Sequence, residues 1–117
     1  MKSIRRGRHF VYILECQDGT YYTGYTSNIE NRIKLHNSGR GAKYTRDRRP
    51  VRLAWKKEYG YFKPAFLKEV RIKKLTRKQK EKLVRGKRLD KVLIKAGHDI
   101  KNILLSIFLI SGDRIRF

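Results

Sequence analysis

Glu69 is the residue whose position is hardest to explain by folding alone. It lies four residues after Ala65 and three before Ile72, within the apolar stripe of a predicted helix. A carboxylate on such a face is costly unless it meets a cation or a metal ion. Two interpretations follow: a metal ligand, or a structural carboxylate that pairs with an arginine of the sheet or reaches the rim of its helix.

Arg32 and His36 are four residues apart on another predicted helix, so their side chains reach the same patch of surface. Arginine binds a phosphate group with a planar fork, and an imidazole can move a proton near neutral pH. The pair suits an anionic site, although a strongly basic chain also carries such pairs by chance.

Phenol side chains are dense in the first half of the chain, at Tyr12, Tyr21, Tyr22, Tyr25 and Tyr44. Strand propensity alone accounts for many aromatic residues of this kind, and we favour that explanation for Tyr21 and Tyr25. The other three tyrosines are candidates for a functional site.

Residues 39–50 (GRGAKYTRDRRP), which we name the basic segment, are predicted to form a loop. The segment contains five lysines or arginines together with Tyr44. It is either a solvated run of charge or a contact surface for phosphates, and its glycines and tyrosine favour the second interpretation. The candidate phosphate contacts are Lys43, Arg46, Arg48 and Arg49.

A predicted β-hairpin decides whether two of the phenols meet. Residues 10–16 and 20–26 read as strands around the turn signal Gln17-Asp18-Gly19. A two-residue turn would place Tyr12 and Tyr22 on opposite faces of the sheet. A three-residue loop with a left-handed Gly19 would pair Cys16 with Thr20 and place both tyrosines on one face.

The remaining elements follow from periodicity and capping signals. Ser27-Asn28 offers an N-cap for a helix that ends near residues 37–39, and Thr76 with Gln79 matches a capping box. The expected elements are a helix from about residue 29, a third strand at 51–59, and helices at 62–74, 76–85 and 89–96. Residues 100–110 are apolar on all sides and could be helix or strand.

Length and charge bound the class of protein. A chain of 117 residues is one domain, and 31 basic against 10 acidic residues give it a net charge of +21. Such a charge indicates either a nucleic-acid partner or an anionic membrane surface. We favour nucleic acid and expect no membrane partner, because the charge is spread through the folded elements and is not gathered in one amphipathic arm. The single cysteine excludes an internal disulfide and a cysteine-rich zinc site. We expect no membrane span and a cytoplasmic location, because no apolar run approaches ~20 residues.

Taken together, these residues resemble the GIY-YIG nuclease superfamily, and most closely its small stand-alone group. Tyr12 lies in a VYI strand, Tyr22-Thr23-Gly24 follows ten residues later, and Arg32 follows after ten more. The resemblance extends over residues 10–85 and includes His36, Tyr44 and Glu69. It also favours the three-residue hairpin loop, because both tyrosines must face one pocket.

The resemblance implies an α+β fold with a three-stranded antiparallel sheet flanked by helices, and metal-dependent hydrolysis of phosphodiester bonds. Tyr22 would be the phenol near the attacking water, with Tyr12 beside it and Tyr44 as a further active-site tyrosine. Arg32 would bind the scissile phosphate and His36 would assist proton transfer or phosphate binding. Glu69 would be the sole protein ligand of one Mg²⁺ or Mn²⁺ ion, a cation that needs only one or two carboxylates.

The resulting hypothesis is an endonuclease that acts on DNA in repair or recombination, with RNA open as a second substrate and a protein partner as a source of specificity. The alternative is a non-catalytic nucleic-acid-binding module with the same fold. That alternative draws on two departures from the family: no asparagine follows Glu69 until Asn102, and the last part of the chain matches nothing in the family. We therefore divide the chain into a nuclease-like domain, residues 1–88, and a helix-prone extension, residues 89–117, which we expect to be non-catalytic.

Overall fold

The computed structural model describes residues 6–96 of the chain, and its elements match the predicted fold class. Three antiparallel strands form one sheet in the order β2-β1-β3, so β1 is the central strand. The elements in chain order are β1 (His9–Glu15), β2 (Tyr21–Thr26), α1 (Ile29–Asn37), α2 (Lys43–Arg46), β3 (Arg52–Tyr59), α3 (Phe62–Lys73), α4 (Arg77–Val84) and α5 (Leu89–Lys95). This architecture confirms the three-stranded antiparallel sheet flanked by helices.

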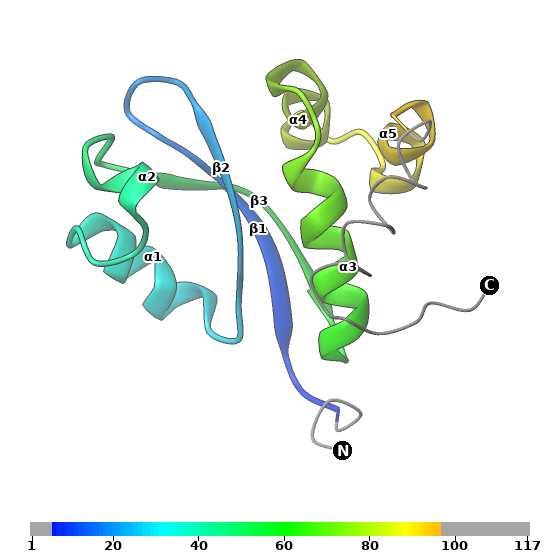
Figure 1. Ribbon diagram of the computed structural model, residues 1–117, viewed down its shortest axis with the longest axis horizontal. Coiled ribbons are helices and arrows are strands. Elements are labelled where there is room, and N and C mark those ends of the chain that lie inside the picture. Colours follow the sequence, from blue (N-terminus) through cyan, green and yellow to red (C-terminus); the bar gives the residue numbers. More distant parts are fainter. Residues whose placement is uncertain (1–5, 97–117) are drawn as a thin grey trace, which may run out of the picture.

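The sheet is covered on both faces. Helices α1 and α2 lie on one side of it, and α3, α4 and α5 lie on the other (Figure 1). Alternate residues of β1 therefore enter two different apolar clusters: Val11 and Ile13 pack on the α3 side, whereas Tyr12 and Leu14 pack on the α1 side. Burial on both faces explains why β1 reads as a nearly continuous apolar run in the sequence.

The β1–β2 hairpin has the three-residue loop. The Cys16 amide donates to the Thr20 carbonyl at 2.8 Å, and Gly19 has a φ of 81°, in the left-handed region that glycine adopts without strain. Leu14 is opposite Tyr22 in the register of the two strands. Tyr12 and Tyr22 consequently lie on the same face of the sheet, as predicted.

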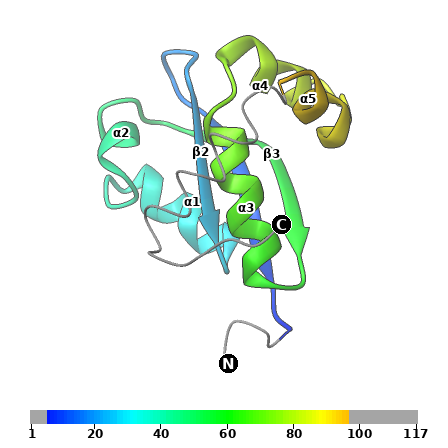
Figure 2. The same cartoon turned by 45° about the vertical axis from the view of Figure 1, so that its right-hand side comes forward.

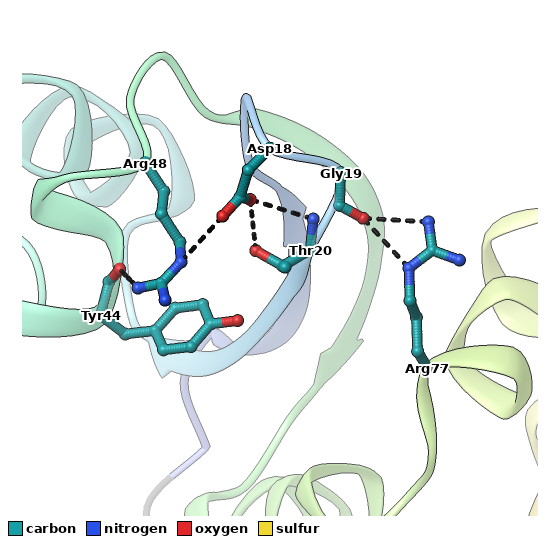
Figure 3. A network of polar contacts seen from close by, with 6 residues as sticks. All are labelled: Asp18, Gly19, Thr20, Tyr44, Arg48 and Arg77. Atoms are coloured by element: carbon teal, nitrogen blue, oxygen red, sulfur yellow. Dashed lines mark hydrogen bonds and ion pairs between the residues drawn. The ribbon is translucent and has the colours of Figure 1, made fainter.

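Two arginines from different layers hold the hairpin turn (Figure 3). Arg48 donates to the Asp18 carboxylate at 3.0 Å, and Asp18 in turn accepts from the backbone amide and hydroxyl of Thr20. On the other side, the Arg77 guanidinium donates twice to the Gly19 carbonyl, at 3.2 and 3.0 Å. The turn thus links the basic segment to the start of α4.

The predicted helix caps are present, whereas the basic segment, predicted to be a loop, contains a short helix. Asn28 caps α1 by accepting from the Asn31 amide, and Thr76 and Gln79 form the capping box of α4. The short helix in the basic segment is α2, which has four residues. Thr45 of this helix is inaccessible to solvent. Four residues are too few to show a helical period in the sequence.

The core on the α3 side extends into the last described helix. Ala65 and Ile72 of α3 are fully buried there, and Leu89 and Val92 of α5 belong to the same cluster. The division of the chain at residue 88 stays a prediction, and the apolar run 103–110 lies outside the described residues. Within residues 6–96, no helix has the length and apolar character needed to cross a membrane.

Candidate active site

A buried chain of hydrogen bonds crosses from the sheet to the basic segment. The Tyr12 hydroxyl lies 2.9 Å from His36 Nε2, and His36 Nδ1 lies 2.8 Å from the Thr45 hydroxyl. Thr45 donates its own proton to the Ala42 carbonyl at 3.1 Å, so it accepts from a protonated Nδ1. Nε2 is then left as the acceptor of the Tyr12 proton.

The surroundings of these hydrogen-bonded side chains keep Tyr12 and His36 neutral. Burial raises the pKa of Tyr12 well above its usual range, and the charge of Tyr22 adds to this effect. Burial also lowers the pKa of His36, and the positive charge of Arg32 lowers it further. Tyr12 is therefore a proton donor to His36 and not a base, and both ring nitrogens of His36 are already engaged.

Tyr22 differs from Tyr12 in its surroundings, because it is half-exposed. Its ring is stacked on Tyr44, with centroids 5.9 Å apart, and makes an edge contact with His36 at 5.2 Å. The Tyr12 ring is 6.5 Å away. Packing on three sides fixes the ring while its hydroxyl donates to no other side chain of residues 6–96.

Two glycines make room for this cluster. A Cβ on Gly24, which is opposite Tyr12 in the register, would lie 2.4 Å from the Tyr12 hydroxyl oxygen. A Cβ on Gly41 would lie 2.3 Å from His36 Nδ1 and 2.7 Å from the His36 backbone Cα. Both positions therefore exclude a side chain, and Gly24 is the glycine of the Tyr22-Thr23-Gly24 motif.

Arg32 and Glu69 approach the cluster from different layers. Arg32 is half-exposed on α1, and its positive charge lowers the pKa values of both His36 and Tyr12. Glu69 lies on α3, on the opposite side of the sheet, and its negative charge raises the pKa of Tyr25 and of Tyr12. The structure thus brings Tyr12, Tyr22, His36 and Tyr44 into contact, with Arg32 and Glu69 close enough for their charges to act on Tyr12.

Glu69 does not make the ion pair with a sheet arginine that one interpretation required. Its carboxylate pairs with Lys73 of its own helix, at 3.3 Å, and its side chain is 15% exposed. Among residues 6–96 no three histidine, cysteine or acidic side chains are grouped for metal binding. A lone, partly accessible carboxylate fits a hard cation such as Mg²⁺ or Mn²⁺, which keeps several waters, and does not fit a structural zinc ion.

The candidate phosphate contacts of the basic segment have unequal environments. Lys43 and Arg46 are exposed, and Arg49 donates to the Arg46 and Asn37 carbonyls. Arg48 is the most constrained, since it bonds Asp18 and places its guanidinium 4.0 Å from the centre of the Tyr44 ring (Figure 3). Arg48 therefore supports Tyr44, and through it the stacked Tyr22.

Thr45, Asp18 and Gly41 belong to this arrangement, but sequence patterns do not point to them. Thr45 has no local signal, because its contact with His36 exists only when α2 folds back onto α1. Asp18 is a residue type that is common in turns, so its identity alone does not mark it as part of a site. Gly41 closely follows Gly39, and nothing in the sequence distinguishes the glycine that faces an imidazole.

Comparison with known proteins identifies the class to which this fold and site belong. A family model described as the GIY-YIG catalytic domain matches residues 8–82, from β1 into α4. The chain therefore belongs to the GIY-YIG catalytic domain family, which confirms the resemblance seen in its tyrosine motifs.

Its relatives are small proteins. A UPF0213 protein of Bacillus licheniformis is 48% identical over 84 residues, which cover 72% of this chain and 87% of the relative. A UPF0213 protein of Halobacterium salinarum is 52% identical over 75 residues, or 64% of this chain and 97% of the relative. The solution NMR structure of a UPF0213 protein from Bacillus halodurans shares 50% identity, covers 67% of this chain and 83% of that one, and has a TM-score of 0.45. The two sequence relatives, which are matched over 87% and 97% of their own length, confirm the small stand-alone group.

Proposed function

We propose that the protein is a divalent-metal-dependent endonuclease that hydrolyses phosphodiester bonds in DNA, in repair or recombination. The observation that carries this proposal is the contrast between the two motif tyrosines. Tyr12 is buried and committed to His36, whereas Tyr22 is half-exposed and fixed by its neighbours, with a hydroxyl that donates to no side chain of residues 6–96. A protein that only binds nucleic acid has no need for such a division between two adjacent phenols.

Tyr22 is the group that we assign to proton transfer with the attacking water. General acid–base catalysis by a positioned side chain contributes typically about 10²–10⁴-fold to a rate, provided that the side chain reaches the proton it moves. The stacked Tyr44 and the edge of His36 hold the Tyr22 ring in one place. Tyr12, His36 and Thr45 form a positioning chain behind it and do not themselves meet the phosphate.

Arg32 and the basic segment are the groups that we assign to phosphate binding. Arg32 is half-exposed and makes no ion pair within residues 6–96, so its guanidinium is available to the scissile phosphate. Lys43, Arg46 and Arg49 would hold neighbouring phosphates. Arg48 would contribute less to binding than the other three, because Asp18 and Tyr44 already engage it.

Glu69 is the residue that would hold the metal ion. When bound there, the ion supplies positive charge that stabilises developing charge on phosphoryl oxygens. The carboxylate is suited to this role because it is only partly exposed and pairs with one flexible lysine, Lys73. The chain is strongly basic, so few other carboxylates are available to balance the charge of a cation bound at Glu69. The phosphates of the substrate would balance that charge.

The alternative function is a nucleic-acid-binding module without catalysis. The specific observation in its favour is the Glu69–Lys73 ion pair, which satisfies the carboxylate without any metal. In this alternative the fold and the basic segment serve binding alone, and specificity comes from a protein partner.

A cleavage assay separates the two functions. Purified protein is incubated with labelled duplex, flapped and branched DNA in Mg²⁺ or Mn²⁺, beside a Glu69→Gln variant. We expect the wild type to cut at least one substrate, and we expect Glu69→Gln to bind DNA as well as wild type but not to cut it. Equal cleavage by freshly purified Glu69→Gln would refute the metal-ligand role, and binding without cleavage by either protein would establish the alternative.

A further inference from the structure

A basic pocket lies at the β3 edge of the sheet. It has a volume of about 500 Å³ and forms where β3, α3 and the start of α5 meet, a region visible in Figure 2. This volume lies within the range of small-ligand sites. The pocket, which we name the Trp55 pocket, is lined by Trp55, Lys56, Lys57, Tyr59, Lys68, Lys87, Arg88, Leu89 and Asp90.

Carboxylates of residues 6–96 compensate only a small part of the positive charge of the Trp55 pocket. Asp90, the only acidic lining residue within the described part of the chain, is already paired with Arg88 at 2.9 Å. The four lysines of the lining make no ion pair with any carboxylate of residues 6–96. Burial lowers the pKa of Lys68, and the nearby charges of Arg71 and Lys57 lower it further. A ligand that brings negative charge would relieve this repulsion.

Aromatic groups accompany the charge. Trp55 and Tyr59 are half-buried in the lining, and the Lys57 ammonium lies 6.0 Å from the centre of the Tyr59 ring. The Tyr59 hydroxyl is buried and finds no hydrogen-bond partner in the part of the chain that the structure describes. Cations interleaved with aromatic rings are the usual means of holding a single nucleic-acid strand, with phosphates on the cations and bases against the rings.

The Trp55 pocket is separate from the candidate active site. Trp55 and Tyr59 pack on the α3 side of the sheet, whereas Tyr12 and Tyr22 pack on the α1 side. The strands of Trp55 and Tyr22 also occupy opposite edges of the sheet, since β3 and β2 flank the central β1. A nucleic-acid segment bound in the Trp55 pocket is therefore different from the segment that contacts Tyr22.

We propose that the Trp55 pocket binds a nucleotide unit of a single-stranded nucleic-acid segment, with its phosphate on Lys57, Lys68 and Lys87 and its base or sugar against Trp55. The binding itself is independent of catalysis. Its consequence for the substrate rests on the proposed function: the DNA that is cut carries a single-stranded arm next to a duplex, because the protein holds two segments at once.

Trp55 is the only tryptophan in the chain, so its fluorescence reports this pocket alone. A single-stranded oligonucleotide is titrated into the protein in a buffer with a metal chelator, where no cleavage occurs. Binding is followed by Trp55 emission and, in parallel, by anisotropy of a labelled oligonucleotide. We expect a saturable change in Trp55 emission that coincides with the anisotropy curve, and a much weaker change with blunt duplex or with inorganic phosphate.

Matched variants test the lysines. The pocket variant combines Lys57→Gln, Lys68→Gln and Lys87→Gln. The control variant combines Lys63→Gln, Lys74→Gln and Lys78→Gln, three exposed lysines outside the pocket, and has the same net charge. On single strands, each phosphate that is no longer neutralised lowers the slope of log K against log salt by about 0.7. We expect the pocket variant to lose up to about 2 in slope and at least about tenfold in affinity, and the control variant to lose far less.

A single variant protects the test against misfolding. Lys87→Gln changes one exposed residue between α4 and α5 and should still weaken the Trp55 response by a fewfold. The proposal is overturned if the oligonucleotide binds without changing Trp55 emission, if blunt duplex changes it equally, or if both triple variants weaken equally. Cleavage without a Trp55 response would refute only this pocket, whereas a Trp55 response without cleavage would refute only the proposed nuclease.

Discussion

Replacing Gly24 by alanine places a methyl group against the ring of Tyr12. The new Cβ would lie 2.4 Å from the hydroxyl oxygen and 2.5 Å from Cζ, whereas ordinary contacts begin at 3.4 Å. The ring must therefore retreat by about 1 Å, and Tyr12 is only 1% exposed, so it has no free space to enter. A displacement of that size also breaks its 2.9 Å hydrogen bond to His36.

The magnitude follows from three contributions. Overpacking of a core costs about 1–3 kcal/mol, and a buried hydrogen bond left unmade costs about 1–3 kcal/mol. Alanine in a strand returns about 0.5–1 kcal/mol relative to glycine. These contributions sum to about 1–5 kcal/mol, so we expect Gly24→Ala to lower the free energy of unfolding by about 3 kcal/mol, a large share of the stability of a small domain.

Urea denaturation measures this change, with Gly60→Ala as the control. A Cβ on Gly60 would lie 3.7 Å from the nearest atom, the Arg6 side chain, and Gly60 does not have a positive φ. We expect that control to unfold within about 1 kcal/mol of wild type. If Gly24→Ala unfolds at the same urea concentration as Gly60→Ala, with equal m-values, Gly24 does not provide the space for Tyr12 and this part of the site geometry is wrong.

Three further outcomes are expected. Burial lowers the pKa of His36 in the folded state, so its contribution to stability is complete above about pH 6.5 and is lost as the pH falls through the folded pKa. At pH values below about 6.5, the urea midpoint of the wild type should therefore decrease, and that of His36→Gln should decrease less steeply. Lys73→Gln, which frees the Glu69 carboxylate, should tighten Mn²⁺ binding severalfold in a calorimetric titration, and an unchanged affinity would argue against Glu69 as the ligand. Replacing the four candidate phosphate contacts of the basic segment by glutamine should flatten the salt dependence of duplex binding by roughly 0.9 for each phosphate that the segment no longer neutralises, whereas an unchanged slope would show that the segment does not bind phosphates.

The hairpin shows why part of this fold can be predicted from sequence. A left-handed glycine fixes a three-residue loop, the loop fixes the register, and the register places Tyr12 and Tyr22 on one face. Each step is local in the chain, so residue types narrow the hairpin to two possible loops, and the resemblance to the GIY-YIG family selects the three-residue one. The helix caps at Asn28 and Thr76 are predictable for the same reason.

The features that sequence does not predict depend on contacts between distant residues. Thr45 meets His36 only because α2 packs on α1, and Arg48 holds Asp18 across thirty residues of chain. The partner of Glu69 is Lys73, one helical turn away. The sequence is compatible with this ion pair, but it does not favour Lys73 over an arginine of the sheet. Such choices among available partners are decided by packing, and no spacing of residues reveals them.

The central claim is that Tyr22 transfers a proton while Tyr12 only positions its neighbours. Single-turnover cleavage of the best DNA substrate at saturating Mg²⁺, with Tyr22→Phe and Tyr12→Phe beside wild type, tests it most directly. We predict that Tyr22→Phe loses at least about 100-fold in rate with unchanged stability and DNA affinity. Tyr12→Phe should unfold more easily by about 1–3 kcal/mol, because the acceptor nitrogen of buried His36 loses its donor, and should keep most of its rate. A Tyr22→Phe variant that cleaves at the wild-type rate would contradict this account.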